Sequence, residues 1–508
     1  MEIEFKLAVP AERLEEVEQA LRAQKTSRTR LQARYFDTAD AALARHGVVL
    51  RLRKEGTHWV QTAKAVVEGQ GALHRLEHNV TLDGRAAKAV PDPLRHADSP
   101  VGKLLGKALG DAACPLGETL STDIWRLARH ERLGETTVEL ALDVGQVMGG
   151  LAEDGRPRSS AVCELELELV QGRVEDLVEI ARGWCERHGL WLSTLSKAER
   201  GQRLAHAADQ GYAVRAEPPQ LAGKTGAQVS GPAFQRAVLA ACLAQVLPNA
   251  SELASGNTDA EVVHQLRVGI RRLRTALREL GAFAPEPAPQ FDASWEPALT
   301  AVFRRLGAQR DTALLLTEMA PRLKAAGAPE IRIPRSGTKA VDIRAVVRAV
   351  SFQVALVGLI GLAAPTDQPA PGGDDDLRRL LKKRLRKLQH QLLADGARFE
   401  SLPVSAQHRM RKRLKRLRYL AEFAAPLFDA KAAAHDIAHL EPAQDALGAF
   451  NDANVALARY REAAVKDPGA WFAVGWLVAQ QGRMARACRK ALQRLGKLHG
   501  FWDKAGGG

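Results

Sequence analysis

The sequence predicts an α+β protein whose N-terminal half is an antiparallel β-barrel and whose C-terminal half is an all-helical bundle. Two kinds of hydrophobic spacing support this: apolar residues alternate with period two in the first half, and they recur with helical spacing in the second. A chain of 508 residues is also too long for one hydrophobic core. Because Arg215–Gly231 is rich in proline and glycine, we expect domains at 1–205 and 231–503, joined by a linker at 206–230.

The predicted barrel rests on short segments in which apolar and polar residues alternate. These segments are Glu2–Ala8, Gly47–Lys54, Trp59–Val66, His74–Leu82, Thr136–Val144 and Ala161–Val170. Helical spacing interrupts them at Ala11–Ala23, near Pro100–Ala108 and at Val174–His188. Several antiparallel strands leave no edge exposed when they close on themselves, so we expect a closed barrel.

Several of these strands carry rows of charge on one face. Glu2, Glu4 and Lys6 share one face of the first strand. Cys163–Leu169 places three carboxylates on one face, and Leu50–Arg53 places two arginines on one face. A half-exposed sheet whose polar face meets water is the simpler interpretation of any one such strand. Adjacent carboxylates repel unless cations screen them, so their recurrence within one domain indicates a charged interior.

The combination of acidic and basic strands fits chemistry on phosphate chains. Carboxylate oxygens are ligands that Mg²⁺ and Mn²⁺ prefer, and arginine and lysine bind the phosphate oxygens that such a metal bridges. Hydrolysis of a phosphoanhydride needs a metal to orient water and fixed cations to neutralise the developing charge. The chain has no GxxxxGK[ST] motif, so a P-loop mechanism has no support.

An ordered set of short motifs runs through the predicted barrel. The motifs are Glu2-x-Glu4-x-Lys6, Tyr35-Phe36-Asp37-Thr38, Leu50-Arg51-Leu52-Arg53, Gln61-Thr62-x-Lys64, the strand with Glu164, Glu166 and Glu168, and Ser196-Lys197. With them, the first 205 residues resemble the CYTH superfamily, the triphosphate tunnel metalloenzymes. The resemblance implies an eight-stranded antiparallel barrel that forms a tunnel, with a triphosphate bound inside.

The same resemblance implies a role for each matching residue. The implied metal ligands are Glu2, Glu4, Glu164 and Glu166, with Asp143 and Glu168 as further ligands. The implied phosphate-binding residues are Lys6, Arg51, Arg53, Lys64, Arg75 and Lys197, together with Arg126 or Arg129. The implied cofactor is Mg²⁺ or Mn²⁺, the nucleophile is a water held by the metal, and the implied catalytic residues are Glu2, Glu4 and Glu166. Four barrel histidines have no metal-binding spacing and are expected on the surface, namely His46, His58, His74 and His78.

The second half contains an internal repeat. His264–Arg274 and His408–Arg418 each begin with a histidine that is followed by basic residues at the same spacings. A second shared element follows each copy, at Leu306–Asp311 and at Leu447–Asp452. We therefore expect two diverged helical units that pack with pseudo-twofold symmetry.

The repeat predicts a basic ridge on a helix. His264, Arg267, Arg271 and Arg274 fall on one helical face, apart from the apolar stripe, and Arg378–Lys387 adds another basic stretch. A solvated charged face is the usual explanation of such positions, but solubility does not require the same spacing in two copies. A nucleic acid is a rival ligand, and we disfavour it because the ridges lack interleaved aromatic residues.

Residues from about 230 to 500 resemble the CHAD domain through these repeated motifs. The resemblance implies an all-helical, internally duplicated bundle whose basic cavity binds inorganic polyphosphate. The implied polyphosphate-binding residues are His264, Arg267, Arg271, Arg274, His408, Arg411, Lys415 and Arg418.

Charge and cysteine content agree with this division and suggest a location. Residues 1–224 carry 31 Lys and Arg against 33 Asp and Glu, whereas residues 225–508 carry 42 against 26, so the second half favours a polyanion. The five scattered cysteines fit a reducing cytoplasm, and the N-terminus lacks a signal-peptide pattern. The apolar stretch Ala345–Ala364 is interrupted by polar residues and predicts a buried helix. We expect a cytoplasmic protein without a membrane partner, associated with polyphosphate granules.

These observations predict a metal-dependent hydrolase of inorganic triphosphate (tripolyphosphate) attached to a polyphosphate-binding module. The same tunnel chemistry fits adenylate cyclase activity or thiamine triphosphate hydrolysis. A rival from another class is a catalytically silent protein that only binds polyphosphate. We disfavour this rival because carboxylates inside a phosphate tunnel contribute little to binding alone.

Overall fold

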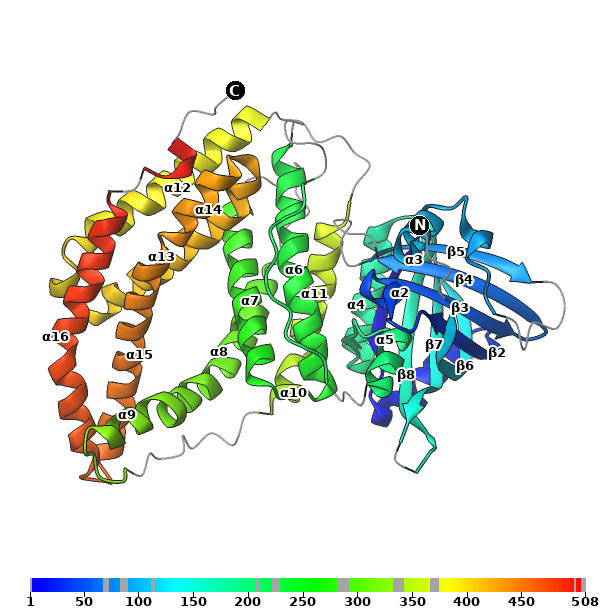
Figure 1. Ribbon diagram of the computed structural model, residues 1–508, viewed down its shortest axis with the longest axis horizontal. Coiled ribbons are helices and arrows are strands. Elements are labelled where there is room, and N and C mark those ends of the chain that lie inside the picture. The colour runs from blue at the N-terminus through cyan, green and yellow to red at the C-terminus, as the bar shows by residue number, and fades with distance from the viewer. Residues whose placement is uncertain are drawn as a thin grey trace.

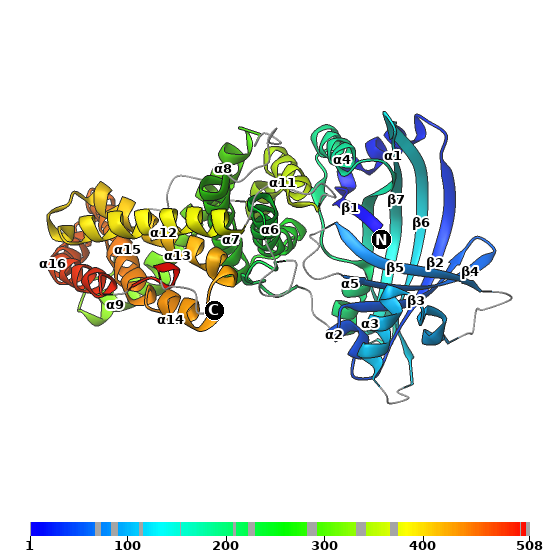
Figure 2. The same cartoon turned by 90° about the horizontal axis from the view of Figure 1, so that it is seen from above.

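The computed structural model places a β-barrel beside a larger helical part, as Figures 1 and 2 show. It describes residues 2–66, 73–82, 90–110, 115–152, 154–206, 210–221, 229–281, 292–331, 342–365, 374–497 and 499–503. The predicted combination of an antiparallel barrel and a helical half is confirmed.

Eight antiparallel strands close into the barrel. They are β1 (Glu2–Ala8), β2 (Ser27–Asp37), β3 (Val48–Glu55), β4 (His58–Val66), β5 (His74–Leu82), β6 (Gly117–Leu133), β7 (Thr136–Leu151) and β8 (Pro157–Gln171). The order is β5-β4-β3-β2-β6-β7-β8-β1, and β1 pairs back onto β5 at Glu2 and Arg75, which closes the cylinder. A short additional strand, β9 (Trp191–Leu192), pairs with the C-terminal end of β1.

Alternation along each strand separates the lumen from the hydrophobic core. Phe5 and Leu7 of β1 and Leu167 of β8 are buried outside the cylinder, where α1 (Leu14–Arg22) and α4 (Val174–His188) cover the barrel. Their charged neighbours therefore point into the lumen. The hydrophobic effect thus fixes the orientation of the charged rows, because a strand that slipped by one residue would bury the charges outside.

The strands β2 and β6 were not among the predicted strand segments. Both carry charge on their outer faces, where Arg30 lies 2.6 Å from Asp123 and Arg34 lies 2.7 Å from Glu118. These cross-strand ion pairs replace the apolar outer face on which the prediction relied. The strand β7 also extends beyond its predicted end at Val144, to Leu151.

The shorter helices around the barrel are α2 (Ala42–Arg45), α3 (Pro100–Leu109) and α5 (Lys197–Ala205). The helical half contains α6 (Gly231–Ser255), α7 (Ala260–Leu280), α8 (Trp295–Ala313), α9 (Ala320–Ala325), α10 (Ile343–Val347), α11 (Val350–Ala363), α12 (Asp374–Gly396), α13 (Val404–Ala424), α14 (Ala430–Ala438), α15 (Glu441–Ala464) and α16 (Ala470–Leu495). Consecutive helices pack as the pairs α6 with α7, α12 with α13, and α15 with α16 (Figure 1).

The apolar helices of this half are part of its core. The predicted buried helix in Ala345–Ala364 is α11, in which 10 of the 14 residues are buried. By length and composition α6 could cross a membrane, but 78% of its apolar stretch is buried inside the protein. A core helix with neighbours on every side has this composition.

The two halves share a packed interface. The helix α11 lies against α4 of the barrel, and a Cβ atom on Gly361 would lie 2.6 Å from Val178 Cγ2. Buried residues on the outer face of the barrel and in the helical half form one continuous hydrophobic cluster. The barrel and the helices are therefore packed against each other rather than only tethered.

Candidate functional site

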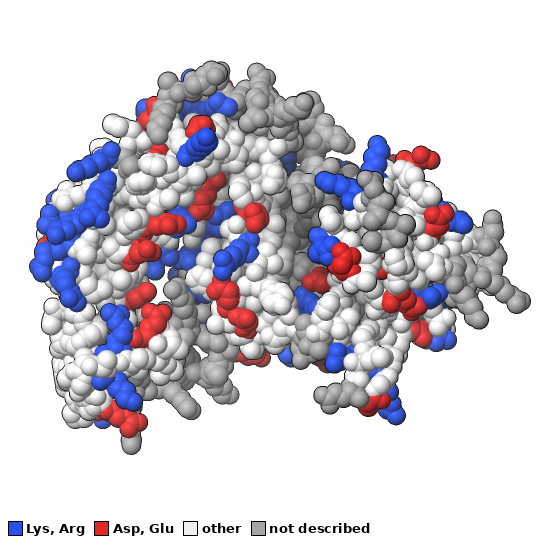
Figure 3. All heavy atoms as spheres, in the orientation of Figure 1, with Lys and Arg blue, Asp and Glu red and all other residues white. Residues whose placement is uncertain are grey.

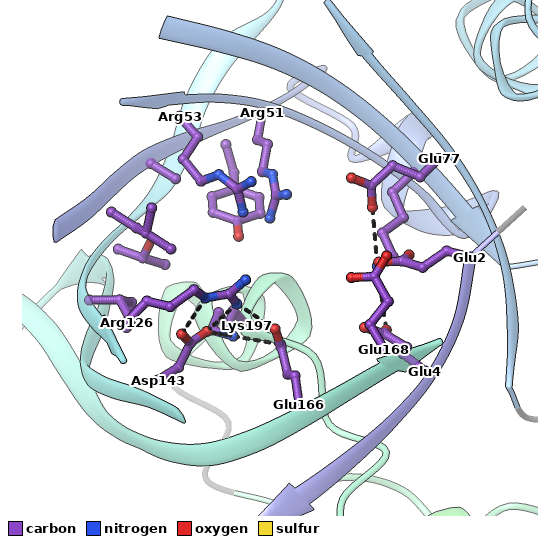
Figure 4. A pocket seen from close by; sticks show the side chains of 16 residues that line it. Glu2, Glu4, Arg51, Arg53, Glu77, Arg126, Asp143, Glu166, Glu168 and Lys197 are labelled. Atoms are coloured by element: carbon purple, nitrogen blue, oxygen red, sulfur yellow. Dashed lines mark hydrogen bonds and ion pairs between the residues drawn. The ribbon is translucent and has the colours of Figure 1, made fainter. Parts of the chain in front are cut away.

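The barrel lumen brings charged side chains from several strands face to face (Figure 4). The cavity has a volume of about 590 Å³. Carboxylates come from β1, β5, β7 and β8, and arginines come from β3 and β6. The remaining wall consists of small and apolar residues of β2 and β6, including Ala33 and Ile124. The lumen is thus a charged tunnel with one apolar strip.

Asp143 of β7 and Glu164 and Glu166 of β8 form one buried group, the acidic triad. One carboxylate oxygen of each lies within 4.8 Å of the others. The Lys197 Nζ lies 2.7 Å from Asp143, 2.5 Å from Glu164 and 2.9 Å from Glu166. Arg126 donates to both oxygens of Asp143 at 2.7 Å. Buried carboxylates stay charged only with such partners, so the two cations keep the triad ionised.

The acidic triad fits a divalent metal ion. Burial by itself would raise the pKa of Glu166, but Lys197 and Arg126 hold it well below its usual range. The same balance lowers the pKa of Asp143. Three ionised oxygen donors from separate side chains suit Mg²⁺ or Mn²⁺, and the Lys197 ammonium already occupies the position of a cation among them.

A second acidic group lies across the lumen. Glu2 and Glu4 of β1 and Glu77 of β5 surround Lys64, whose Nζ contacts Glu2 and lies 3.4 Å from Glu4 and 3.2 Å from Glu77. Arg75 Nε lies 2.9 Å from Glu4 Oε1. Burial raises the pKa of Glu2 to about 7, whereas Lys64 outweighs burial at Glu77 and lowers its pKa to about 2. The predicted carboxylates therefore divide between two groups rather than forming one metal site.

Arginines face these carboxylates from the strands above them in Figure 4. Arg51 and Arg53 project from β3 into the lumen, beside Tyr35 of β2. Arg53 Nε donates to Glu55 at 2.6 Å, which fixes its guanidinium. Tyr35 raises the pKa of Arg51 against the effect of burial. This wall offers planar cations that suit phosphate oxygens.

The remaining predicted lumen residues lie toward the two openings. Lys6 and Arg75 line the opening that faces α5, and burial lowers the pKa of Lys6. Glu168 lines the other opening together with Glu139. Burial and the charge of Glu139 raise the pKa of Glu168. All predicted lumen residues therefore face the tunnel, at different depths.

The sequence left Arg126 and Arg129 as alternatives, and the structure distinguishes them. Arg126 reaches into the lumen, whereas Arg129 lies outside the cylinder and donates to Gln24 at 3.0 Å and to Glu131 at 2.7 Å. Residues three positions apart on a strand point to opposite faces. Arg126 is therefore the lumen residue.

Glu77 was not among the predicted site residues, although the alternation along β5 places it on the same face as Arg75, two positions away. Two residues of the family motifs have structural contacts instead of facing the lumen. In the Tyr35–Thr38 motif, Asp37 accepts hydrogen bonds from the backbone of Leu43 and Ala44 and holds the start of α2. The side-chain amide of Gln61 donates to the backbone carbonyl of Asp92 and accepts from the backbone N–H of the same residue. Both residues position the barrel wall rather than a ligand.

The histidines of the barrel lie outside the lumen. His46 and His58 are exposed, as predicted, and the side chain of His74 lies outside the described residues. The prediction of an exposed histidine is wrong for His78, which is half-buried. Its Nδ1 lies 2.9 Å from Nδ1 of the buried His96.

The first ridge of the helical half packs against α8. Arg267 donates to the Phe303 carbonyl oxygen at 2.8 Å and lies 4.5 Å from the centre of the Phe303 ring. Arg271 and Arg274 lie 5.9 Å from the same ring, and Arg274 Nε also donates to Glu296 at 2.9 Å. His264 is half-buried on the same helix. Three predicted arginines therefore gather around one aromatic ring.

The second ridge packs against α15 in a similar way. His408 Nδ1 lies 2.8 Å from Asn451 Oδ1, so the two shared elements of this repeat are in contact. Arg418 donates to Glu422 at 2.8 Å and to Gln444 at 2.7 Å. Arg411 and Lys415 are half-buried. The side chains of Arg310 and Asp311, which belong to the matching element of the first repeat, lie outside the described residues.

Reciprocal ion pairs connect the two repeats. Arg272 and Arg416 occupy equivalent positions in the two copies. Arg272 of α7 pairs with Glu422 of α13, and Arg416 of α13 lies 3.5 Å from Glu279 of α7. An approximate twofold relation between α7 and α13 produces such an exchange of partners.

The third basic stretch, Arg378–Lys387, lies on α12, which packs beside α13. Figure 3 shows Lys and Arg side chains gathered along the outer edge of the helical half, where α12 and α16 lie. Several are paired with acids: Arg379 with Asp376 at 2.6 Å and Arg386 with Asp503 at 2.6 Å. This stretch forms an outer basic surface.

Comparisons with known proteins agree with this division of the chain. Residues 1–202 match the CYTH domain family and residues 237–461 match the CHAD domain family. An inorganic triphosphatase from Haemophilus influenzae is 27% identical over 174 residues, which are 34% of this chain and 44% of that protein. The chain therefore matches less than half the length of this relative.

Two solved structures resemble parts of the chain. The CHAD domain from the plant Ricinus communis is 25% identical over 56% of this chain and 98% of its own, with a TM-score of 0.40. A protein from Hippeastrum, described as having a dominant triphosphatase activity, is 19% identical over 41% of this chain and 97% of its own, with a TM-score of 0.32. With a family match in each half, the chain belongs to the proteins that join an N-terminal CYTH domain to a C-terminal CHAD domain.

Proposed function

We propose that the barrel hydrolyses inorganic triphosphate (tripolyphosphate) to diphosphate and phosphate, with Mg²⁺ or Mn²⁺ as the cofactor. The observation that carries this proposal is the lumen, where arginines of one wall face two groups of carboxylates in a single cavity (Figure 4). A linear triphosphate needs cations along its oxygens and a metal at the bond that breaks. The similarity to an inorganic triphosphatase over part of the chain supports the same substrate.

The fixed cations of the lumen bind the phosphate groups. Arg51, Arg53 and Arg126 present planar guanidinium groups that can each bind two phosphate oxygens and that stay charged at physiological pH. Lys6 and Arg75 hold the end of the phosphate chain nearest α5. A cavity of this size with few aromatic groups favours a bare phosphate chain over a nucleotide, whose base would need a stacking partner.

The acidic triad of Asp143, Glu164 and Glu166 would bind the metal ion. When bound, a divalent metal would act as a Lewis acid and lower the pKa of an attached water. The Lys197 ammonium and the Arg126 guanidinium offset part of the negative charge of the triad, and Lys197 would contact phosphate oxygens when a metal ion is bound. Glu2 and Glu4 form the second carboxylate group, with Glu2 on the opposite wall able to accept a proton from water.

The helical half supplies a polyphosphate-binding module in this proposal. Arginines of the first ridge gather around Phe303, and Arg411 and Lys415 lie on the second ridge. Polyphosphate has a high charge density and no bases, which matches cations without a base-stacking row. Attachment of the barrel to this module would raise the local concentration of the hydrolase near polyphosphate in the cytoplasm.

Phosphate release from tripolyphosphate, ATP and thiamine triphosphate tests the proposal, measured with Mg²⁺, Mn²⁺ or EDTA. We expect metal-dependent turnover of tripolyphosphate above the other two. Turnover of ATP to cyclic AMP, or of thiamine triphosphate alone, would replace the proposed substrate. No turnover of any substrate, with polyphosphate binding retained, would identify a binding protein instead.

A further inference from the structure

We propose that the helical half is a structural part of the tunnel site, because its helices α6 and α11 hold the segment that carries Lys197. Ser251 of α6 and Gln353 of α11 are then positioning residues for this lysine. The kinetic consequences rest on the proposed function, but the positioning itself does not.

The segment in question begins at β9, an edge strand with one side paired to β1. The amide of Ser193 donates to the β1 backbone at 2.9 Å. The alternate amides point the other way, and the helical half accepts them: Leu192 N–H donates to Gln353 Oε1 at 2.9 Å, and Thr194 N–H donates to Ser251 Oγ at 3.1 Å. Edge strands usually leave such amides to water. Here two side chains of the other domain take the place of a neighbouring strand.

Both acceptors are fixed in place. Gln353 is 1% exposed and donates its amide N–H to the Val347 carbonyl at 2.6 Å, which orients its oxygen toward β9. Ser251 is 2% exposed. Arg348 lies 3.6 Å from the centre of the Trp191 ring and donates to the Ala254 carbonyl at 2.9 Å. Breaking these bonds would leave the buried amide of Leu192 and the partly buried amide of Thr194 without their protein partners, and losing a buried bond costs more than losing an exposed one.

The helix α5 is held at its far end as well. Arg203 pairs with Glu199 of its own helix at 2.6 Å and with Glu252 of α6 at 2.7 Å. On its other face α5 contacts the barrel closely, since a Cβ atom on Gly201 would lie 2.6 Å from Leu120 Cδ2. The helix is therefore clamped between the barrel wall and α6.

Lys197 is the first residue of this clamped helix, three residues after Thr194. Its ammonium lies 2.5 to 2.9 Å from each carboxylate of the acidic triad. A shift of the segment by a fraction of an ångström would alter all these contacts together, and catalytic rates are sensitive to such displacements. The helical half thus sets the position of a lumen cation without contacting the lumen.

The test uses the full chain with Ser251→Ala, the rescue variant Ser251→Thr, and the control Ser255→Ala, an exposed serine of the same helix. We expect Ser251→Ala to speed hydrogen exchange of the 192–199 backbone amides and to weaken tripolyphosphate binding in EDTA about threefold to tenfold. With Mg²⁺ or Mn²⁺ in place of EDTA, kcat should fall by a similar factor. Ser251→Thr and Ser255→Ala should behave as wild type in all three measurements.

A double-mutant cycle separates positioning from general loss of stability. In a Lys197→Ala background, Ser251→Ala should not weaken tripolyphosphate binding further, because its effect acts through the lysine. Equal effects in both backgrounds, or unchanged amide exchange in Ser251→Ala, would overturn the proposal. Hydrogen exchange and tripolyphosphate binding in EDTA can be measured without turnover. If the protein shows no triphosphatase activity, the proposed function fails, but these two measurements still test the positioning of Lys197.

Discussion

The barrel lumen and the ridges of the helical half are both lined by basic side chains, yet they manage charge differently. In the lumen, cations and carboxylates from different strands face each other across a cavity, as Arg51 of β3 and Glu166 of β8 do (Figure 4). In the helical half, ridge cations contact nearby groups of adjacent helices, as Arg267 does with Phe303 and Arg418 with Gln444. The first arrangement is built for a ligand that inserts between opposite charges. The second presents cations to a ligand that lies along a surface.

This difference follows from secondary structure. In a closed sheet, the hydrogen-bond register between strands fixes which side chains point into the lumen. Charged side chains from distant parts of the sequence are therefore held around one cavity. A helix displays its charged face to one side, and the neighbouring helix supplies the counter-charge. Changes in the lumen should therefore affect catalysis strongly, whereas changes on the ridges should affect binding of long anions in smaller increments.

The largest effect is expected for Glu166→Gln in the acidic triad. Removing one ionised ligand should lower kcat for tripolyphosphate by about 100-fold or more, because metal and charge stabilisation are both weakened. The control is Glu175→Gln, an exposed carboxylate of α4. Phosphate release measures the effect, and a fall of less than about threefold in a folded variant would remove Glu166 from the site.

The next largest effect is expected for Arg53 of β3, in the arginine-lined wall of the lumen. Arg53→Ala should raise KM for tripolyphosphate about tenfold or more, because the variant lacks a guanidinium that can donate two hydrogen bonds to phosphate oxygens. Arg30→Ala on the outer face of the same barrel provides the matched control, because Arg30 pairs with Asp123 away from the lumen. Similar KM values for the two variants would argue against phosphate binding by the β3 wall.

A smaller effect is expected on the ridges. Arg411→Ala with Lys415→Ala should weaken polyphosphate binding about tenfold at low salt and leave tripolyphosphate turnover unchanged. Arg409→Ala, an exposed cation of the same helix, is the control. Titration of polyphosphate by calorimetry at two salt concentrations gives the affinities. If the control weakens binding as much as the double variant, the ridge has no special role.

The smallest effect concerns stability at low pH. Gln61, whose amide is oriented by Asp92, donates to His96 Nε2 at 2.9 Å, so His96 must stay neutral. Burial, together with the charge of His78, lowers the pKa of His96 to about 4. The unfolded chain takes up this proton at a pH of about 6.5, so the free energy of unfolding should fall by about 1 to 2 kcal/mol as the pH drops through this window.

Urea unfolding of the wild type and of His96→Gln between pH 7 and pH 4 measures this contribution. The variant should lack the extra loss of stability. Parallel pH profiles of the two proteins would show that His96 does not titrate in this way.

Period-two alternation predicted the closed barrel and most lumen residues, because outward leucines and inward charges are both visible in the sequence. It failed for β2 and β6, where Arg30 and Arg34 are paired on the outer face and the apolar residues line the lumen instead. It also missed the division of carboxylates into two groups. That division depends on which strands are neighbours around the barrel, and no local pattern contains this information. For the same reason the sequence did not show that Gln353 contacts the segment before Lys197.

Metal-dependent hydrolysis in the lumen is tested by phosphate release from tripolyphosphate by the wild type and by Glu4→Gln, with Mg²⁺ or Mn²⁺ and with EDTA. We expect turnover by the wild type that EDTA abolishes and that Glu4→Gln reduces at least about 100-fold, with polyphosphate binding intact in both proteins. Wild-type protein that binds polyphosphate but releases no phosphate under any of these conditions would contradict this prediction.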